Sequence, residues 1–260
     1  MAFRPSRDLL ATGSALCALA FAAGALWPRP AGAIGELTAV DIRGIDYGGG
    51  RASPRPTAPQ RLAWETRQRT SVETRLEPTR ARLSDPKVFD TPLLYWTGDQ
   101  AFPQLSEAEV TGLKRFVEFG GAVLIDDAAP EQEGFDSAIR RELERAFGRN
   151  ALTRLPATHT VYRSFYLLDR PVGRVPGPDH IEAVVRSGRA AVIYTRHDLG
   201  GAIDRDNLGN YLHPVEPGGE SQREMAIRFG VNLVVYALCL DYKDDQVHAP
   251  FIMRRRAGQR

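Results

Sequence analysis

The chain has 260 residues, of which 43% are hydrophobic and 25% are charged. This is the composition of an ordinary globular protein, and it excludes a collagenous, low-complexity or wholly disordered polymer. The formal net charge is +2, and because residues 1–33 contain three arginines and one aspartate, the rest of the chain holds 31 charges of each sign. We therefore expect no nucleic-acid partner, since such a partner requires a basic face or stripe.

The N-terminal segment has the features of an export signal. Two arginines precede an uncharged run at 9–27, which is followed by the small-residue pattern Ala31-Gly32-Ala33. A signal peptidase cuts after such a pattern. We therefore expect residues 1–33 to be a signal peptide that is cleaved after Ala33, and the mature protein to be periplasmic or secreted. An uncleaved membrane anchor is the alternative interpretation.

The next part of the chain predicts two strands with a helix between them. Residues 37–45 are rich in aliphatic side chains and predict a first strand. Three glycines and three prolines between positions 47 and 59 predict a loop. A polar helix is expected at 60–69, and the loose alternation at 72–83 predicts a second strand.

The middle of the chain alternates between strands and helices. The continuous apolar run at 92–96 is typical of a strand that is buried on both faces of a parallel sheet. Ser106 and Glu109 form a capping box, which predicts the start of a helix that ends at two glycines. A second buried strand at 122–125 and an amphipathic helix around 135–147 follow. This order implies parallel strands joined by right-handed crossovers.

The last part of the chain predicts an irregular segment, a hairpin and a long helix. Residues 150–180 contain four prolines and look irregular. Two short apolar runs, at 181–185 and 190–194, flank a turn sequence and predict a hairpin. A helix is expected from Ser221 to Leu240. Charged residues lie in its first half, so we interpret it as a core helix and expect no stable membrane span after the leader is removed.

These elements predict one α/β domain at 34–253, followed by a basic tail at 254–260 that contains four arginines. Of the two cysteines, Cys17 lies in the leader, so the mature chain cannot close an internal disulfide. Cys239 lies in an apolar stretch, and we expect it to be a small buried hydrophobic residue.

Several segments match a known family in their order and spacing. They include PLLYWTG at 92–98, AVLIDD at 122–127, YTRHDLG at 194–200 and GVNLVVYAL at 230–238. Over nearly all of residues 37–253, the chain resembles the bacterial family of domains of unknown function numbered 4159. The middle block also resembles, more loosely, the trehalose-utilisation (ThuA-like) branch of the class I glutamine-amidotransferase-like fold.

The looser resemblance implies a flavodoxin-like three-layer sandwich with a mostly parallel sheet, in which any site lies at the carboxyl ends of the strands. The predicted hairpin would be a late addition to this sheet. Catalytic amidotransferases of this fold place a cysteine after the strand that corresponds to 122–125, but none stands there in this chain. There is also no Gly-x-Ser-x-Gly elbow. Covalent acyl chemistry by Cys or Ser is therefore not expected.

Polar residues follow the predicted strands and are our candidate ligand-binding residues. They are Tyr47, Thr97, Asp99, Asp126, Asp127, Arg196, His197 and Asp198, together with His159 in the irregular segment. Because the carboxyl ends of parallel strands meet at one edge of a sheet, we expect these side chains to converge there. The alternative is structural, since acidic residues at strand ends also cap helices and accept hydrogen bonds from loop amides.

Three functions remain open on these grounds. The leading hypothesis is an exported, non-catalytic domain that binds a polar small molecule, such as a carbohydrate, or an envelope protein. The alternative is a hydrolase that uses Asp99, Asp126, Asp127 and His197 as acid, base or metal ligands. The third is a purely structural module of an envelope complex. No histidine has zinc-like spacing to another, so we expect no bound metal and no other cofactor.

Overall fold

The computed structural model describes residues 39–47 and 53–257, and of residues 240–257 it describes the backbone alone. The described residues belong to one compact unit, Ala39–Arg260. The expected signal peptide with its cleavage site and the side chains of the expected basic tail lie outside the described residues.

The described residues form a seven-stranded sheet with the strand order β2-β1-β3-β4-β7-β6-β5. The strands are β1 (Ile42–Asp46), β2 (Arg80–Arg82), β3 (Leu93–Gly98), β4 (Ala122–Asp127), β5 (Leu152–Arg154), β6 (Glu182–Arg186) and β7 (Arg189–Thr195). Neighbours from β2 to β7 pair in parallel, whereas β6 and β5 are antiparallel additions at one edge. The expected mostly parallel sheet with a late hairpin is confirmed.

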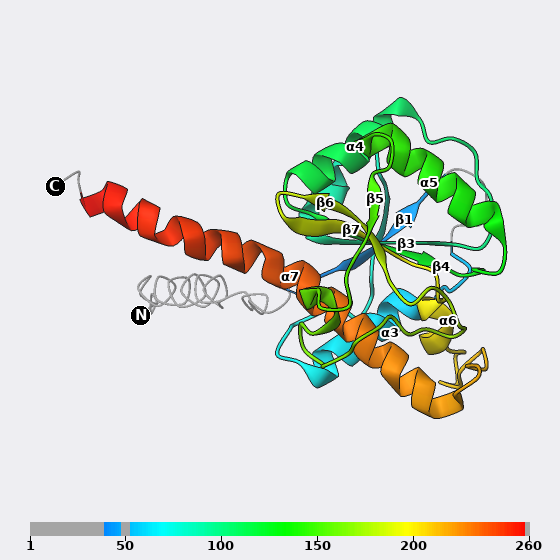
Figure 1. Ribbon diagram of the computed structural model, residues 1–260. Helices are drawn as coiled ribbons and strands as arrows, with labels where there is room; N and C mark the ends of the chain where they lie inside the picture. Colours follow the sequence, from blue (N-terminus) through cyan, green and yellow to red (C-terminus); the bar gives the residue numbers. More distant parts are fainter. Residues whose placement is uncertain (1–38, 48–52, 258–260) are drawn as a thin grey trace, which may run out of the picture. The chain divides into compact units, whose positions relative to one another are not determined.

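Helices cover both faces of this sheet (Figure 1). They are α3 (Ala58–Arg69), α4 (Glu107–Glu118), α5 (Glu133–Phe147), α6 (Leu199–Ile203) and α7 (Gly219–Ala257), with short 3-10 helices η2 (Pro86–Asp90) and η3 (Thr160–Tyr162). Helices α3, α6 and α7 pack together on one face, and α4 and α5 pack together on the other. This arrangement is a flavodoxin-like three-layer sandwich, as the resemblance implied.

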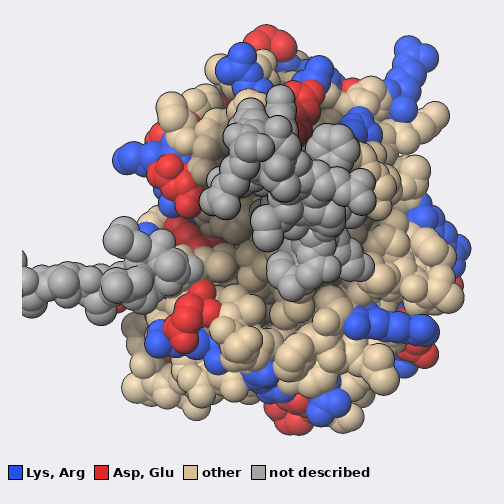
Figure 2. Space-filling view, turned by 90° about the vertical axis from the view of Figure 1, so that its left-hand side faces the viewer, with Lys and Arg blue, Asp and Glu red and all other residues tan. Residues whose placement is uncertain are grey.

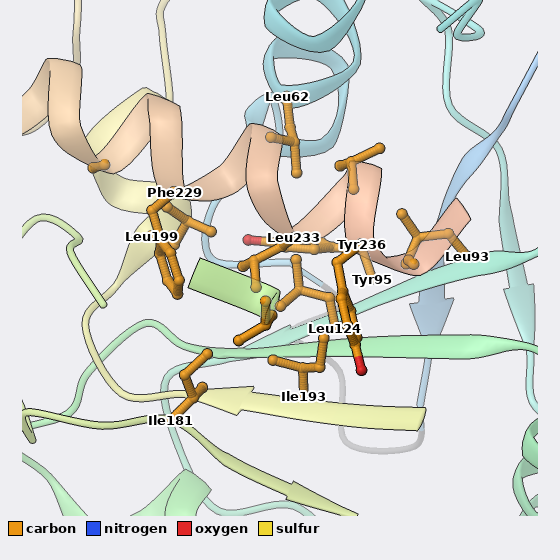
Figure 3. Close-up of a cluster of buried hydrophobic side chains, with 14 of the residues drawn as sticks. Leu62, Leu93, Tyr95, Leu124, Ile181, Ile193, Leu199, Phe229, Leu233 and Tyr236 are labelled. Carbon is orange, nitrogen blue, oxygen red and sulfur yellow. The ribbon is translucent and has the colours of Figure 1, made fainter. Parts of the chain in front are cut away.

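Alternating side chains of the central strands divide the apolar core between the two faces. From β3, Leu93 and Tyr95 enter the core under α3, α6 and α7, whereas Leu94 and Trp96 enter the core under α4 and α5. Figure 3 shows the first of these cores, where Leu233 of α7 lies close to the side chains of the sheet. Because every residue of β3 and β4 is buried, the first four residues of each strand form a continuous apolar run in the sequence.

Local signals explain where two of these elements begin and end. The Ser106 hydroxyl accepts the backbone N–H of Glu109 at 3.3 Å, and the Glu109 carboxylate accepts the Ser106 N–H at 2.9 Å, so the expected capping box starts α4. Between β6 and β7, Ser187 and Gly188 both have positive φ, 50° and 76°. Two such residues form the tight turn that a hairpin requires, and the predicted hairpin is confirmed.

Helix α7 differs in two respects from its prediction. Its backbone continues to Ala257, well beyond the expected end at Leu240. Cys239 is exposed, so our expectation of a buried cysteine is wrong. The reason is that the packing of α7 against the sheet ends near Leu238, where the buried stretch of the helix stops. No helix within the described ranges has the length and apolar character that a membrane crossing demands.

Candidate functional site

The carboxyl ends of β3, β4 and β7 lie side by side. Thr97 is paired with Asp126 across β3 and β4, and Asp126 is paired with Thr195 across β4 and β7. Gly98 is paired with Asp127 in the same register. The polar residues that follow the strands are therefore gathered at one edge of the sheet, and their individual contacts decide what this edge can do.

Asp126 is fully buried and holds the first turn of α6 against the sheet. Its carboxylate accepts the Tyr95 hydroxyl at 2.7 Å and the backbone N–H groups of Leu199 and Gly200 at 2.8 and 2.7 Å. Burial and the nearby carboxylate of Asp198 raise the pKa of Asp126 to about 7. These contacts give Asp126 a structural role, and they leave its carboxylate without access to solvent.

Asp198 joins three separate segments of the chain. It caps α6 by accepting the Gly201 N–H at 2.9 Å, with its own backbone in the left-handed region at φ 49°. Arg55, from the segment before α3, donates two hydrogen bonds to its carboxylate at 2.9 and 2.7 Å. Arg174, from the loop at 168–179, donates a third from its Nε. This buried charge is therefore paired in the bidentate geometry that Arg prefers.

Arg55 extends this network to the neighbouring loop. Its Nη1 lies 3.0 Å from Nε2 of His213, and its Nη2 donates to the Ala128 carbonyl at 3.2 Å. Burial lowers the pKa of His213, and the adjacent Arg55 lowers it further. We refer to Asp126, Asp198, Arg55, Arg174 and His213 as the Asp198 cluster.

Asp127 lies on the opposite face of the sheet from Asp126, because successive side chains of a strand alternate. It accepts the Ala129 N–H at 3.1 Å, and the Tyr194 hydroxyl lies 3.3 Å from it. That hydroxyl also donates to Asp136 at 2.9 Å, and Nε of Arg196 lies 3.6 Å from the Asp136 carboxylate. Burial raises the pKa of Asp127 to about 6. The edge is thus divided by β4 into an Asp126 side and an Asp127 side.

His197 is almost completely buried, with 3% of its surface exposed. Its Nε2 lies 2.8 Å from the Pro178 carbonyl, and its Nδ1 lies 3.0 Å from the Thr195 hydroxyl. A carbonyl only accepts hydrogen bonds, so the proton is on Nε2 and Nδ1 accepts from Thr195. Burial lowers the pKa of His197 to about 4. The ring is neutral near pH 7, and it supports the loop at 168–179.

The remaining candidates are spread around the fold. The Tyr47 hydroxyl donates to the Thr97 carbonyl at 2.9 Å, and burial and the half-buried Asp99 raise the pKa of Tyr47. His159 caps η3 by accepting the Val161 N–H at 3.2 Å, and its ring centroid lies 5.5 Å from that of Tyr236.

The position of Tyr236 locates His159 relative to the sheet. The Tyr236 hydroxyl accepts the N–H of Ala190, which is the second residue of β7. His159 therefore lies toward the amino end of β7, whereas Thr195, His197 and the other edge residues lie at its carboxyl end.

Two hollows flank the loop at 168–179. One, of about 610 Å³, lies between this loop and the first turns of α7, with His197 among its lining residues. We call it the loop–α7 cavity. The other, of about 360 Å³, is lined by Pro130, Glu131 and Arg196. Residues 175–178 line both hollows and so form the wall between them.

On the face shown in Figure 2, acidic and basic side chains are interspersed. Within the part of the chain that the structure describes, no group of three or more His, Cys, Asp or Glu side chains is placed to hold a metal ion. The described residues thus offer buried charges that are already paired, and two hollows beside them.

A family model described as "Domain of unknown function (DUF4159)" matches residues 41–238. The chain belongs to this family. The DUF4159 match runs from β1 to the packed part of α7, so it includes the Asp198 cluster and both hollows. No curated protein matches the chain. The looser resemblance to the ThuA-like branch stays a prediction.

Some residues of this region carried little signal in the sequence. Arg55 and Arg174 lie in loops, where no periodicity marks a buried side chain. Asn232 had a signal, because it is polar within the apolar run of α7. It is fully buried, its Nδ2 donates to the Tyr162 and Tyr166 carbonyls at 2.7 and 2.9 Å, and its Oδ1 accepts the Phe165 and Tyr166 N–H groups at 3.0 and 2.7 Å. It fixes the segment that leads into the loop at 168–179.

Proposed function

We propose that the protein is a non-catalytic binding domain whose ligand, a polar small molecule, occupies the loop–α7 cavity. The observation that carries the proposal is that Asp169 and Arg170 both line this cavity, and neither side chain makes a hydrogen bond or ion pair with another described residue. Charged groups at a hollow of about 610 Å³ are available to a ligand of ordinary size.

The walls of the cavity are fixed before any ligand arrives. The Leu168 N–H donates to the Tyr162 carbonyl at 3.0 Å, and Arg174 is paired with Asp198. The Gln222 amide of α7 donates to the Gly173 carbonyl at 2.9 Å, so the loop is tied to the helix across the cavity. A site that is already ordered loses less conformational entropy on binding. This rigidity favours binding of a small molecule.

The edge residues favour binding over catalysis. Asp126 and Asp198 accept hydrogen bonds from the protein and are fully buried. The pKa of His197, lowered to about 4, makes it a weak base near neutral pH. A general base must reach the proton that it removes, and these groups are instead directed at neighbouring protein atoms.

The test is a ligand screen with a matched pair of variants. Thermal unfolding of the full-length chain is followed with panels of sugars, amino acids, organic acids and nucleotides. Ser221 lines the cavity and is exposed, so Ser221→Trp fills the hollow. Ser137 is exposed on α5, and Ser137→Trp is the control. We expect a compound that raises the melting temperature of the wild type and of the control but not of Ser221→Trp. A flat response across all panels would exclude the proposal.

A hydrolase is the second candidate, and one observation favours it. The pKa values of Asp126 and Asp127 are raised to about 7 and about 6, and a carboxyl that exchanges its proton near neutral pH can serve as an acid or base. Replacement of either residue by Asn, which keeps the shape of the side chain, should then abolish hydrolysis of an activated ester or glycoside. Unchanged turnover in both variants would remove this candidate.

The proposed binding domain acts after export, in the periplasm or outside the cell. The support is the sequence of residues 1–33, with its apolar run and the small residues before Ile34. N-terminal sequencing of the exported protein should begin at Ile34, and an intact Met1 on membrane-bound protein would contradict cleavage.

If the protein is instead a structural module of the envelope, a stable protein partner should co-purify with it while no compound shifts its melting temperature.

A further inference from the structure

We infer that the ligand of the loop–α7 cavity is a zwitterion, with a free amine and a free carboxylate joined by an apolar part, as in an amino acid or short peptide. This inference rests on the proposed function. It is carried by the juxtaposition of two unpaired opposite charges with an apolar floor in one cavity.

The two charges are adjacent in the chain. Asp169 and Arg170 both line the cavity, and within the described residues neither has a partner of opposite charge. A ligand ammonium group fits the Asp169 carboxylate, and a ligand carboxylate fits the planar fork of the Arg170 guanidinium, which can donate two parallel hydrogen bonds. A ligand with both charges satisfies both side chains, whereas a ligand with one charge leaves the other side chain unpaired.

The rest of the lining is mostly apolar. Leu168, Val172 and Met225 contribute to it, together with several prolines of the loop. Such a surface buries an apolar side chain of the ligand favourably. No Phe, Tyr or Trp is among the lining residues, so the cavity lacks the large rings on which sugars stack. This combination favours an amino acid or short peptide over a neutral carbohydrate.

The segment that carries the two charges is anchored on both sides. On one side, Asn232 of α7 holds the backbone of Phe165 and Tyr166. On the other, the Val175 N–H donates to the His197 carbonyl at 3.2 Å. Because both ends of the loop are anchored, Asp169 and Arg170 extend from a backbone whose position is defined, which is the condition for selectivity between charged and blocked ligands.

The experiment is isothermal titration calorimetry of the full-length chain with four probes. These are the dipeptide alanyl-leucine, its N-acetylated form, its C-amidated form, and maltose as a neutral sugar. The variants are Asp169→Asn and Arg170→Gln. Arg163→Gln is the control, because Arg163 is an exposed arginine of the same region that does not line the cavity.

We expect the dipeptide to bind, and each blocked form to bind at least tenfold more weakly, since each has lost one charge-assisted hydrogen-bonded pair. Arg170→Gln should weaken binding of the dipeptide at least tenfold and leave the C-amidated form unchanged. Asp169→Asn should do the same for the dipeptide and leave the N-acetylated form unchanged. The control should bind all probes as the wild type does.

Four results would overturn the inference. Equal affinity for the dipeptide and its blocked forms would show that the charges of the ligand do not contribute to binding. A dipeptide affinity that neither variant changes would show the same. Binding of maltose without dipeptide binding, lost in Ser221→Trp, would leave the proposed function standing and remove the zwitterion. A failure of every probe here, together with the flat response in the screen above, would remove both.

Discussion

Replacement of His197 by Gln tests whether this ring is a buried neutral support for the loop at 168–179. In the folded protein the pKa of His197 is lowered from 6.5 to about 4 by burial. The unfolded chain takes up a proton as the pH falls below 6.5, while the folded chain does not until about pH 4. The stability that neutral His197 contributes is therefore complete above pH 6.5 and is lost as the pH falls from 6.5 to 4.

The size of this effect follows from the shift. The difference between a pKa of 6.5 in the unfolded chain and about 4 in the folded protein amounts to about 3 kcal/mol in total, of which about 2 kcal/mol is lost between pH 8 and pH 5. A glutamine has no proton to gain in this range, and its amide can still donate to the Pro178 carbonyl. At pH 8 the variant loses the hydrogen bond from Thr195, at a cost of about 1 kcal/mol.

The assay is urea-induced unfolding of the wild type and His197→Gln at pH 8, 7, 6 and 5, followed by circular dichroism. Comparing the two proteins at each pH cancels the contributions of all other titrating groups. We expect the wild type to be more stable at pH 8 and the variant to overtake it as the pH falls toward 5. A difference in unfolding free energy that is the same at pH 8 and pH 5 would refute the assignment of His197 as a buried neutral ring.

Three further variants test other contacts. Asp126→Asn should show the opposite pH dependence, because the raised pKa of Asp126 makes the wild type gain stability as the pH falls through about 7. The same urea series measures the unfolding free energies of the wild type and this variant, and a difference between them that does not change with pH would contradict the prediction. Asn232→Ala removes hydrogen bonds to the segment at 162–166 and should lower the unfolding free energy by about 3 kcal/mol, with a loss below 1 kcal/mol arguing against its anchoring role. In Gly177→Ala the added methyl group would overlap the Arg196 carbonyl oxygen, so it should displace residues 175–178. Binding of any ligand in the loop–α7 cavity should then be weaker, and calorimetry that finds wild-type affinity would contradict this.

The centre of the fold could be predicted because its signals are local. The buried strands at 92–96 and 122–125 show as continuous apolar runs, and the capping box at Ser106 marks the start of α4. The edges could not be predicted in this way. Strand β5 has three residues, too few for any periodicity, and it exists because it pairs with β6. Helix α6 has five residues, two of them glycine, and depends on the carboxylates that cap it.

The edge of the sheet could be located from the sequence, but the loop–α7 cavity could not, and His197 is the one candidate residue that lines it. Position after a strand was enough to place Thr97, Asp126 and Asp127 at one edge of the sheet. The predicted strand ended at residue 125, whereas β4 continues through Asp126 and Asp127, so the alternation of these two side chains to opposite faces was not predicted. The partners of Asp198 come from distant loops: Arg55 lies 143 positions away in the chain.

That long separation has a consequence for biogenesis. The ion pair of Arg55 and Asp198 can form only after the chain between them, which includes β3, β4 and the hairpin, has been synthesised, and closing so long a loop costs conformational entropy. Arg174, which helps to shape the wall of the loop–α7 cavity, is attached to the same carboxylate. A nascent or truncated polypeptide without Asp198 would thus lack the ion pairs that hold Arg55 and Arg174, and the wall of the loop–α7 cavity would not be held in place.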